Sequence, residues 1–207
     1  MADRSRGQVV AIILAAGAST RLGRPKQLLD LGGKPVIVHV VERALSASLD
    51  GAMVVTGGAG EAVAEAVAPY PVRLVPNPAY REGQSTSLIA GLNALPADVD
   101  AVVVLLGDQP GIDPADIDAV AARRRDVLMP VPPVVMTAYG SQRSHPILFG
   151  REVFPELLAI SGDQGGRDVI RARASDVVAI ASVHPEPPLD LDTEEAYRAL
   201  LRTWPTS

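Results

Sequence analysis

The sequence predicts an α/β fold, built on a doubly wound, mostly parallel sheet with a small antiparallel extension. Short apolar runs alternate with helical segments through the first 125 residues, which is typical of strand–helix–strand units with parallel strands. The apolar residues are mainly Ala, Val, Leu and Ile, and aromatic residues make up only 3% of the chain. Such residues suit parallel strands that are buried on both faces. At 207 residues the chain is long enough for a full core, so we expect a single domain over residues 1–207.

The first half of the chain shows the alternation clearly. A continuous apolar run predicts the first strand, and Ala-Val-Val-Val-Leu-Leu, the most apolar run, predicts a later one. Pro35 suits the first position of a helix, and Ser85 is expected to cap another. The strands are expected at 9–14, 52–56, 72–75 and 100–106, and the helices at 35–48, 61–68, 85–95 and 114–125.

After Asp126 the pattern changes to shorter elements. A turn at Gly140-Ser141 between two short apolar runs predicts an antiparallel hairpin appended to the sheet. Thr193 is expected to cap a final helix that continues to about Leu201. The strands are expected at 127–131, 134–139, 146–149 and 177–183, with a short extended piece at 189–191. Helices are expected at 153–160 and 167–172, on either side of a glycine-rich loop at 161–166.

Composition restricts the partners and the chemistry. The formal net charge of −5 gives no sign of a surface for nucleic acid or anionic membranes. Cysteine is absent, which excludes disulfides, thiolate metal sites and cysteine nucleophiles. The polar N-terminus lacks the order of a signal peptide, and no apolar run reaches the length of a membrane span. We therefore expect a cytoplasmic enzyme without nucleic-acid or membrane partners.

The loop after the first strand has the features of a phosphate site. The apolar run breaks at Gly17 into a loop of small residues, and Arg21 and Lys26 follow within a few positions. Small residues let the backbone approach an anion closely, so that its amides and the nearby cations bind phosphate together. Considered alone, the same stretch is equally compatible with an ordinary strand–turn–helix connection that carries surface cations.

Asp108 is the sharpest single candidate, because it directly follows the most apolar strand. A carboxylate there can hold a hard cation such as Mg²⁺ together with substrate phosphates, and Asp192 or Asp190 would add a second carboxylate. The alternative is that Asp108 only stabilises the turn before Pro110. Ligands of open parallel sheets bind beyond the carboxyl ends of the strands, so the glycine loop and these carboxylates are expected to share one crevice.

The order of the motifs resembles that of the MobA-like nucleotidyltransferases, most closely the molybdenum cofactor cytidylyltransferase branch. The resemblance extends over most of the chain, from about Val9 to Tyr197. It rests on these stretches: Leu14-Ala-Ala-Gly17, Arg21-Leu-Gly23, Pro25-Lys-Gln-Leu-Leu29, Gly107-Asp-Gln-Pro110, Arg143-Ser-His-Pro-Ile-Leu-Phe149, Gly162-Asp-Gln-Gly-Gly-Arg167 and Asp190-Leu-Asp-Thr193. It implies a Rossmann-like fold of the GT-A-like nucleotidyltransferase type.

The resemblance also implies a role for each candidate residue. Catalysis would depend on Arg21, Lys26 and Asp108, with Mg²⁺ held by Asp108 and Asp192. Ala16 replaces a glycine that is usual in the guanylyl-transferring branch, which favours CTP over GTP. The nucleotide would contact Leu14, Ala15, Ala16, Gly17, Lys26, Asn77, Ser85, Ser87 and Gly107, and the acceptor Gln109, His145, Asp163 and Arg167. Plain structural roles remain open for Ser85, Ser87, His145 and the 162–167 loop.

The function implied by the resemblance is transfer of a nucleotide monophosphate, CMP in preference, from an NTP to a phosphorylated pterin with release of pyrophosphate. A molybdoenzyme that receives the cofactor is a further candidate partner. Two alternatives stay open. One is an NAD(P)H-dependent oxidoreductase of the nicotine-blue-reductase type, although Gly17 opens no Gly-x-Gly-x-x-Gly fingerprint and no acidic residue follows the second strand. The other is a non-catalytic chaperone that binds the molybdenum cofactor.

Overall fold

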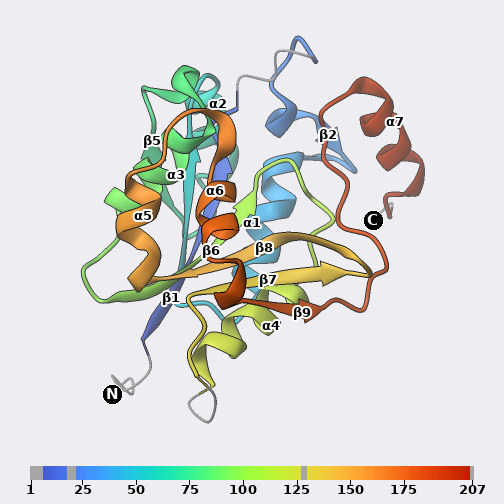
Figure 1. Cartoon of the computed structure of the whole chain (residues 1–207). Helices are drawn as coiled ribbons and strands as arrows, with labels where there is room; N and C mark the ends of the chain where they lie inside the picture. The colour runs from blue at the N-terminus through green and yellow to red at the C-terminus, as the bar shows by residue number, and fades with distance from the viewer. Residues whose placement is uncertain (1–6, 18–21, 127–129, 206–207) are drawn as a thin grey trace.

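A seven-stranded sheet forms the centre of the molecule in the computed structural model, which describes residues 7–17, 22–126 and 130–205 (Figure 1). The strand order across the sheet is β5-β4-β1-β6-β8-β7-β9. A separate two-stranded ribbon pairs β2 (Asp30–Leu31) with β3 (Lys34–Pro35). The strands of the large sheet are β1 (Gln8–Ala15), β4 (Gly51–Thr56), β5 (Arg73–Pro76), β6 (Val99–Leu106), β7 (Val134–Tyr139), β8 (Gln142–Gly150) and β9 (Val177–Ala181).

The predicted doubly wound, mostly parallel sheet is confirmed. β5, β4, β1 and β6 are parallel neighbours, and β9 is parallel to β7. Only β8 runs against the others, because it is antiparallel to both β6 and β7. The predicted hairpin therefore exists, but it lies inside the sheet instead of at its margin. β8 is long enough to pair on both sides, with β6 along one edge and β7 along the other.

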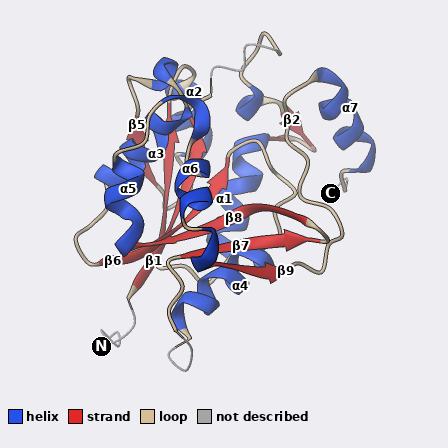
Figure 2. Ribbon diagram, viewed as in Figure 1, coloured by secondary structure: helices blue, strands red, loops and turns tan. Residues whose placement is uncertain are grey.

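Helices cover both faces of the sheet (Figure 2). Alternate residues of β1 point to opposite faces, so that Ile13 packs in one apolar cluster and Ile12 in the other. The first cluster includes residues of α1 (Val36–Ser46), α2 (Gly60–Val67) and α4 (Pro114–Arg125). The second includes residues of α3 (Gln84–Asn93), α5 (Phe154–Leu158) and α6 (Arg167–Ala172). Short 3-10 turns are η1 (Lys26–Leu28), η2 (Tyr80–Glu82), η3 (Arg151–Val153), η4 (Gly162–Gln164) and η5 (Ala174–Asp176).

A third apolar cluster joins the end of the chain to its beginning. The last helix, α7 (Glu194–Thr203), lies beside the β2–β3 ribbon (Figure 1). Leu29, Leu31, Val36 and Leu191 form the buried centre of this cluster, and Leu22, Tyr197, Leu200 and Trp204 pack against it. The guanidinium of Arg24 also pairs with Glu194, at 2.8 Å between Nη2 and Oε2. α7 therefore braces the segment that carries Lys26.

Helix starts agree with the sequence in two cases and differ in a third. Asp113 caps α4 by accepting from the amide of Ala115 at 2.9 Å, and Thr193 caps α7 by accepting from the amide of Ala196 at 3.1 Å. The prediction that Ser85 caps α3 is wrong. α3 begins at Gln84, after Gly83, whose φ of +122° is reached readily only by glycine.

Two further expectations need correction. Of the strand expected at 127–131, residues 127–129 lie outside the described part, and Pro130 and Val131 are not in a strand. Prolines at 130, 132 and 133 offer no backbone donor to a ladder, which explains why pairing starts only at Val134. The piece at 189–191 forms no strand either. Among the described residues, no helix combines the length and the apolar character needed to cross a bilayer.

Candidate active site

A large pocket opens beyond the carboxyl ends of β1 and β6. The chain moves from β1 to β4 and β5 on one side, and then returns to place β6 on the other side, so this is the point where the strand order reverses. The cavity has a volume of about 920 Å³, in the range of sites for small molecules and cofactors. Its lining includes Leu14, Ala16, Gly17, Arg24, Lys26, Gln27, Tyr80, Arg81, Gln84, Ser87, Asp108, Asp163, Arg167, Asp190 and Asp192.

The end of β1 forms the floor of this pocket. Ala16 and Gly17 line it, whereas Ala15 is buried in the core beneath. The amide of Gly107 donates to the carbonyl of Leu14 at 2.9 Å. A Cβ at position 107 would lie 2.9 Å from that same carbonyl oxygen, so the close approach of β6 to β1 requires glycine. Gly107 therefore acts behind the lining, by holding the two strand ends together.

A buried hydrogen bond holds the backbone that carries Lys26 in place. Gln27, its neighbour in η1, is 2% exposed, and its Nε2 donates to the carbonyl of Gly17 at 3.4 Å. This bond links the η1 turn to the loop that follows β1. The buried Gln27 therefore fixes the position of the backbone from which the Lys26 side chain extends into the pocket.

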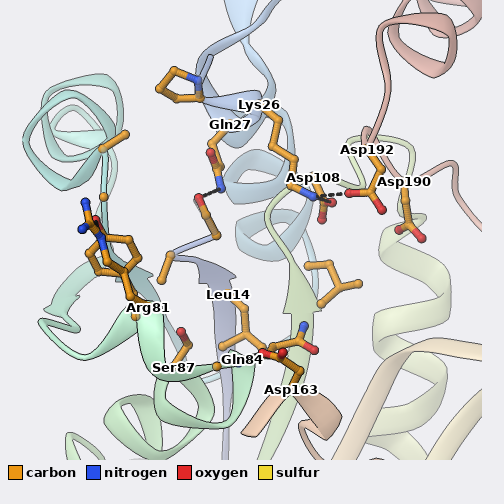
Figure 3. Close-up of a pocket in the computed structure, with 18 of the residues that line it drawn as sticks. Leu14, Lys26, Gln27, Arg81, Gln84, Ser87, Asp108, Asp163, Asp190 and Asp192 are labelled. Carbon is orange, nitrogen blue, oxygen red and sulfur yellow. Dashed lines mark hydrogen bonds and ion pairs between the residues drawn. The ribbon is translucent and has the colours of Figure 1, made fainter. Parts of the chain in front are cut away.

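An ion-pair network forms the polar wall of the pocket (Figure 3). The ammonium of Lys26 donates to the carboxylates of both Asp108 and Asp192, with 2.6 Å between Nζ and Oδ1 of Asp192. Burial disfavours the charge on Lys26, but the Asp108 carboxylate and the two hydrogen bonds outweigh that cost, so the pKa of Lys26 is raised. Asp108 is 9% exposed. These three side chains, far apart in the sequence, meet in one pocket, as expected from the position of the loop and the carboxylates beyond the carboxyl ends of the strands.

A second set of contacts ties the two acidic segments together. The amide of Leu191 donates to the carbonyl of Asp108 at 3.3 Å, and Leu191 itself is fully buried. The Nε2 of Gln109 donates to Oδ1 of Asp190 at 2.7 Å. Desolvation and the nearby Asp108 carboxylate raise the pKa of Asp190. Gln109, expected to contact the acceptor, is 2% exposed and lies behind the lining, where it orients Asp190.

The chemistry of these donors fits a hard divalent cation. Carboxylate oxygens are the ligands that Mg²⁺ and Mn²⁺ prefer, and Mg²⁺ usually takes one or two carboxylates plus phosphates and water. Asp108 and Asp192 already share one cation, the ammonium of Lys26. In the described part of the chain, no group of three or more acidic or histidine side chains is arranged to hold a metal ion. The residues therefore fit a metal that arrives with substrate phosphates better than a metal held by protein alone.

Three residues expected to bind the nucleotide lie in or near α3, and only some of them line the pocket. Ser87, in the first turns of α3, lines the pocket. Asn77 lies behind it and donates through Nδ2 to Oγ of Ser87 at 3.0 Å and to Oγ1 of Thr86 at 2.9 Å. Ser85 is 1% exposed, and its buried hydroxyl has no hydrogen-bond partner in the structure. Of these residues, Ser87 alone is placed to touch a ligand in the pocket.

The expected acceptor residues divide in the same way. Asp163 and Arg167 line the pocket, but the carboxylate of Asp163 also accepts from the amide of Gln84 at 3.3 Å and so caps α3. His145 does not line the pocket. Desolvation, together with the charge of Arg167, lowers the pKa of His145 to about 4, so its ring is neutral at pH 7. Of the residues expected to contact the acceptor, Arg167 is thus the one that brings a positive charge to the pocket.

Sequence reasoning missed several lining residues, and one predicted residue cannot be placed. Tyr80 and Arg81 line the pocket from the polar stretch between β5 and α3, and Gln84 lines it from the first position of α3. The length of that irregular stretch was a usable signal, because long loops often carry binding residues. Arg24 was missed although it lies close to Lys26. Arg21 lies outside the described residues.

Comparison with known proteins agrees with the geometry. The MobA-like NTP transferase domain matches residues 11–177. The nicotine blue oxidoreductase of Paenarthrobacter nicotinovorans is 29% identical over 97% of this chain and 100% of its own. The crystal structure of Rv0371c from Mycobacterium tuberculosis H37Rv is 33% identical, with a TM-score of 0.84 over 96% of this chain and 100% of that chain. Its complex with manganese is 30% identical, with a TM-score of 0.79 over 96% and 100%.

The family match covers both β1 with its loop and β6 with Asp108, which are the two strands whose ends form the pocket floor. Asp190 and Asp192 lie beyond it, yet they line the same pocket. The solved structures extend the likeness over nearly the whole chain. The chain therefore belongs to the MobA-like NTP transferase family.

Proposed function

We propose that this chain is a metal-dependent cytidylyltransferase, which moves CMP from CTP to a phosphorylated pterin of the molybdenum cofactor type and releases pyrophosphate. The observation that carries the proposal is the meeting of Lys26, Asp108 and Asp192 in a large pocket at the ends of β1 and β6. A cation and two carboxylates beside a small-residue loop suit a triphosphate with its metal.

The reaction needs positioning more than covalent catalysis. An anionic oxygen of the acceptor phosphate attacks the α-phosphorus of CTP, a new P–O bond forms, and the bond from that phosphorus to the β-phosphate oxygen breaks. No side chain has to act as a nucleophile or to remove a proton from the attacking oxygen. Lys26 is placed to stabilise negative charge on the phosphates, and Arg21 is proposed to assist it.

The metal would be held by Asp108 and Asp192. When bound, Mg²⁺ would neutralise phosphate charge as a Lewis acid. The chain's own residues orient the substrates around it. Gln109 holds Asp190 in place, and Arg167 offers a cation toward the phosphate of the acceptor, with His145 as a neutral neighbour. The preference for CTP rests on Ala16, which lines the pocket where the guanylyl-transferring branch has glycine.

A reductase is the second candidate, favoured by the likeness to the nicotine blue oxidoreductase over the whole length of that protein. β4 ends at Thr56-Gly57, where an acidic side chain for a dinucleotide ribose would be expected in a Rossmann fingerprint. The residues at the strand ends therefore favour the transferase. A cofactor chaperone would bind the pterin without turnover.

The test is pyrophosphate release from CTP or GTP with Mg²⁺ and molybdopterin as the acceptor, measured for the wild type, Asp108→Asn and Asp168→Asn. We expect activity with CTP, a loss of at least about 100-fold in Asp108→Asn because charge stabilisation is lost, and little change in Asp168→Asn. Asp168 is an exposed carboxylate of α6 that pairs with Arg171.

Full activity in Asp108→Asn would contradict the assignment of the metal site. Thermal shifts with CTP, GTP, ATP and NADPH, each with and without Mg²⁺, separate the candidate functions, since a ligand that binds only the native state stabilises it. Stabilisation by NADPH alone would favour the reductase. Binding of the pterin without pyrophosphate release would favour the chaperone.

A further inference from the structure

A strap of residues 182–192 leads from β9 toward α7 and carries Asp190 and Asp192 to the pocket (Figure 1). From Ser182 to Asp190 the strap forms no helix or strand, and each of its residues is half-buried or exposed. Val183, for example, is 86% exposed. Apolar packing therefore does little to hold this part of the strap, and its position depends on polar contacts.

The strap runs antiparallel to residues 108–116, the segment that leads from β6 into α4. At the pocket end, Nε2 of Gln109 donates to Oδ1 of Asp190 at 2.7 Å. At the far end, Nε2 of His184 donates to Oδ2 of Asp113, also at 2.7 Å. The partners follow one another in reverse order along the two segments, so the strap is held at both of its ends.

The start of α4 holds the far end of the strap. Oδ1 of Asp113 accepts from the amide of Ala115 and caps α4, whereas Oδ2 accepts from His184. The hydrogen bond from His184, followed by that from Ala115, lowers the pKa of Asp113, so this carboxylate is ionised at pH 7. Next to this pair, Oγ of Ser182 donates at 2.9 Å to Oδ2 of Asp116, a residue that is 5% exposed.

Between its two ends the strap spans a second cavity. This cavity has a volume of about 200 Å³ and is lined by residues of both segments, among them Gly111 and Pro188. Three of the four residues at 185–188 are proline, and proline restricts the backbone and stiffens a segment. A stiff segment without packing beneath it passes a displacement of His184 on to Asp190.

We propose that His184 and Asp113 are positioning residues for the carboxylates of the pocket. Their contact fixes the far end of the strap, and the stiff segment sets the place of Asp190 and Asp192 beside the end of β6. This inference rests on the proposed function, because it gives the strap a task in nucleotide transfer. A far end that is released gives the carboxylates more freedom, and misplacement by about 1 Å can cost a reaction about 100-fold in rate.

The first test is hydrogen exchange at the amide of Leu191, which donates to the carbonyl of Asp108 at 3.3 Å. His184→Ala should accelerate this exchange about three- to tenfold, the effect of one ordinary hydrogen bond on the opening of the strap. Asp113→Ser should do the same. Serine still offers an oxygen that caps α4, but it has no second oxygen for His184.

The second test is steady-state kinetics with CTP and molybdopterin. His184→Ala should lower kcat by about tenfold and leave the KM for CTP little changed, because the lining from β1 and α3 is untouched. His184→Gln should restore most of kcat and of the exchange protection, since its Nε2 can still donate to Asp113. The double variant His184→Ala/Asp113→Ser should be no slower than either single variant, because both changes remove the same contact.

Glu156→Ala is the matched control. Glu156 of α5 accepts from Nε of Arg173 at 2.9 Å, and neither residue belongs to the strap or lines the pocket. These two side chains are 40% and 28% exposed, against 50% and 32% for His184 and Asp113. The control removes a polar contact of similar exposure, so exchange at Leu191 and kcat should both stay as in the wild type.

Unchanged exchange at Leu191 in both His184→Ala and Asp113→Ser would overturn the proposal, and so would faster exchange with an unchanged kcat. A loss of kcat that His184→Gln does not restore would overturn it as well. Both single variants should fold, because the contact between His184 and Asp113 is half-exposed. Failure of the proposed function is separate: wild-type protein that turns over no CTP or GTP would refute the transferase, whereas faster exchange in the variants would still show that the pair holds the strap.

Discussion

At the scale of single residues, the pocket and its surroundings contain one basic side chain that stays protonated and one that stays neutral at pH 7. Lys26 keeps its proton because two carboxylates face it, whereas His145 loses its proton because it is desolvated beside the cationic Arg167. At pH 7 the ammonium of Lys26 is therefore charged and the imidazole ring of His145 is neutral. The difference gives His145 a measurable effect on stability.

His145 should make the folded protein sensitive to acid. Its pKa falls from 6.5 to about 4 on folding, so between these values the unfolded chain binds a proton that the folded chain excludes. Stability contributed by the neutral ring is present above about pH 6.5 and is lost as the pH falls toward 4. From pH 7 to pH 5 this linkage should lower the free energy of unfolding by about 1 to 2 kcal/mol.

Urea unfolding of the wild type and His145→Asn at pH 7 and pH 5 measures this contribution. The variant should lose less stability between the two pH values, because asparagine takes up no proton. An equal loss in both proteins would show that His145 does not exclude the proton in the folded state.

At the scale of elements, the start of α3 depends on a residue from a distant loop. Gly83 adopts a positive φ, and a Cβ there would lie 2.5 Å from the carbonyl oxygen of Gly162. Asp163, 79 residues from Gln84, accepts from the first amide of the helix. The loop whose Asp163 is expected to contact the acceptor is therefore packed on the helix that carries Ser87. The two sides of the pocket are structurally joined.

Asp163→Ala should weaken the first turn of α3. Loss of a capping carboxylate costs about 1 kcal/mol, so we expect a free energy of unfolding lower by about that amount. Hydrogen exchange at the amides of the first turn, from Gln84 to Ser87, should accelerate. Glu82→Ala, which removes an exposed carboxylate from the neighbouring η2 turn, is the control. Equal exchange rates in Asp163→Ala and the wild type would contradict the capping role.

At the scale of the whole molecule, α7 joins the two ends of the chain around the pocket. The helix has no fully buried residue, yet Leu200, Tyr197 and Trp204 pack on the segment between Leu22 and Val36. The hydroxyl of Tyr197 also donates to the carbonyl of Asp30. Because Lys26 lies in the braced segment and Asp192 directly precedes Thr193, the cap of the helix, docking of α7 holds both halves of the ion-pair network.

Leu200→Ala should loosen this docking, and the chain contains its own reporter. Trp204 is the single tryptophan and lies at the C-terminal end of α7, edge-on to the ring of His39 with 4.9 Å between ring centroids. We expect a red-shifted Trp204 emission and a free energy of unfolding lower by about 1 to 2 kcal/mol from lost apolar contact. Leu201→Ala, at a side chain that is 42% exposed, should leave the emission unchanged. Equal spectra for Leu200→Ala and the wild type would contradict the docking.

The sequence predicted the parts of the fold that depend on local pattern. β1 and β6 are buried on both faces, so their continuous apolar runs identified them, and Asp113 and Thr193 cap helices that begin directly after them. Asp108 was identified for the same reason, since a carboxylate at the end of a buried strand stands out.

Features that depend on contacts between distant segments could not be predicted in this way. Nothing near Ser85 indicates that Asp163 caps α3, and nothing near Gln109 indicates that its amide is bonded to Asp190. The position of β8 inside the sheet depends on pairing with two partners, which its own residues do not encode locally. The resemblance supplied the order of the site motifs, and the structure supplied the distances between them.

The lysine between Asp108 and Asp192 also bears on mismetallation. An open pair of carboxylates binds Zn²⁺ or Cu²⁺ more tightly than Mn²⁺, as the Irving–Williams order describes, and would collect whichever ion is strongest. In this structure the ammonium of Lys26 contacts both carboxylates, so any divalent ion that reaches them has to compete with a cation that belongs to the protein itself. That competition acts against every adventitious divalent ion alike, which protects the pocket from the strongest binders as well as from the weakest.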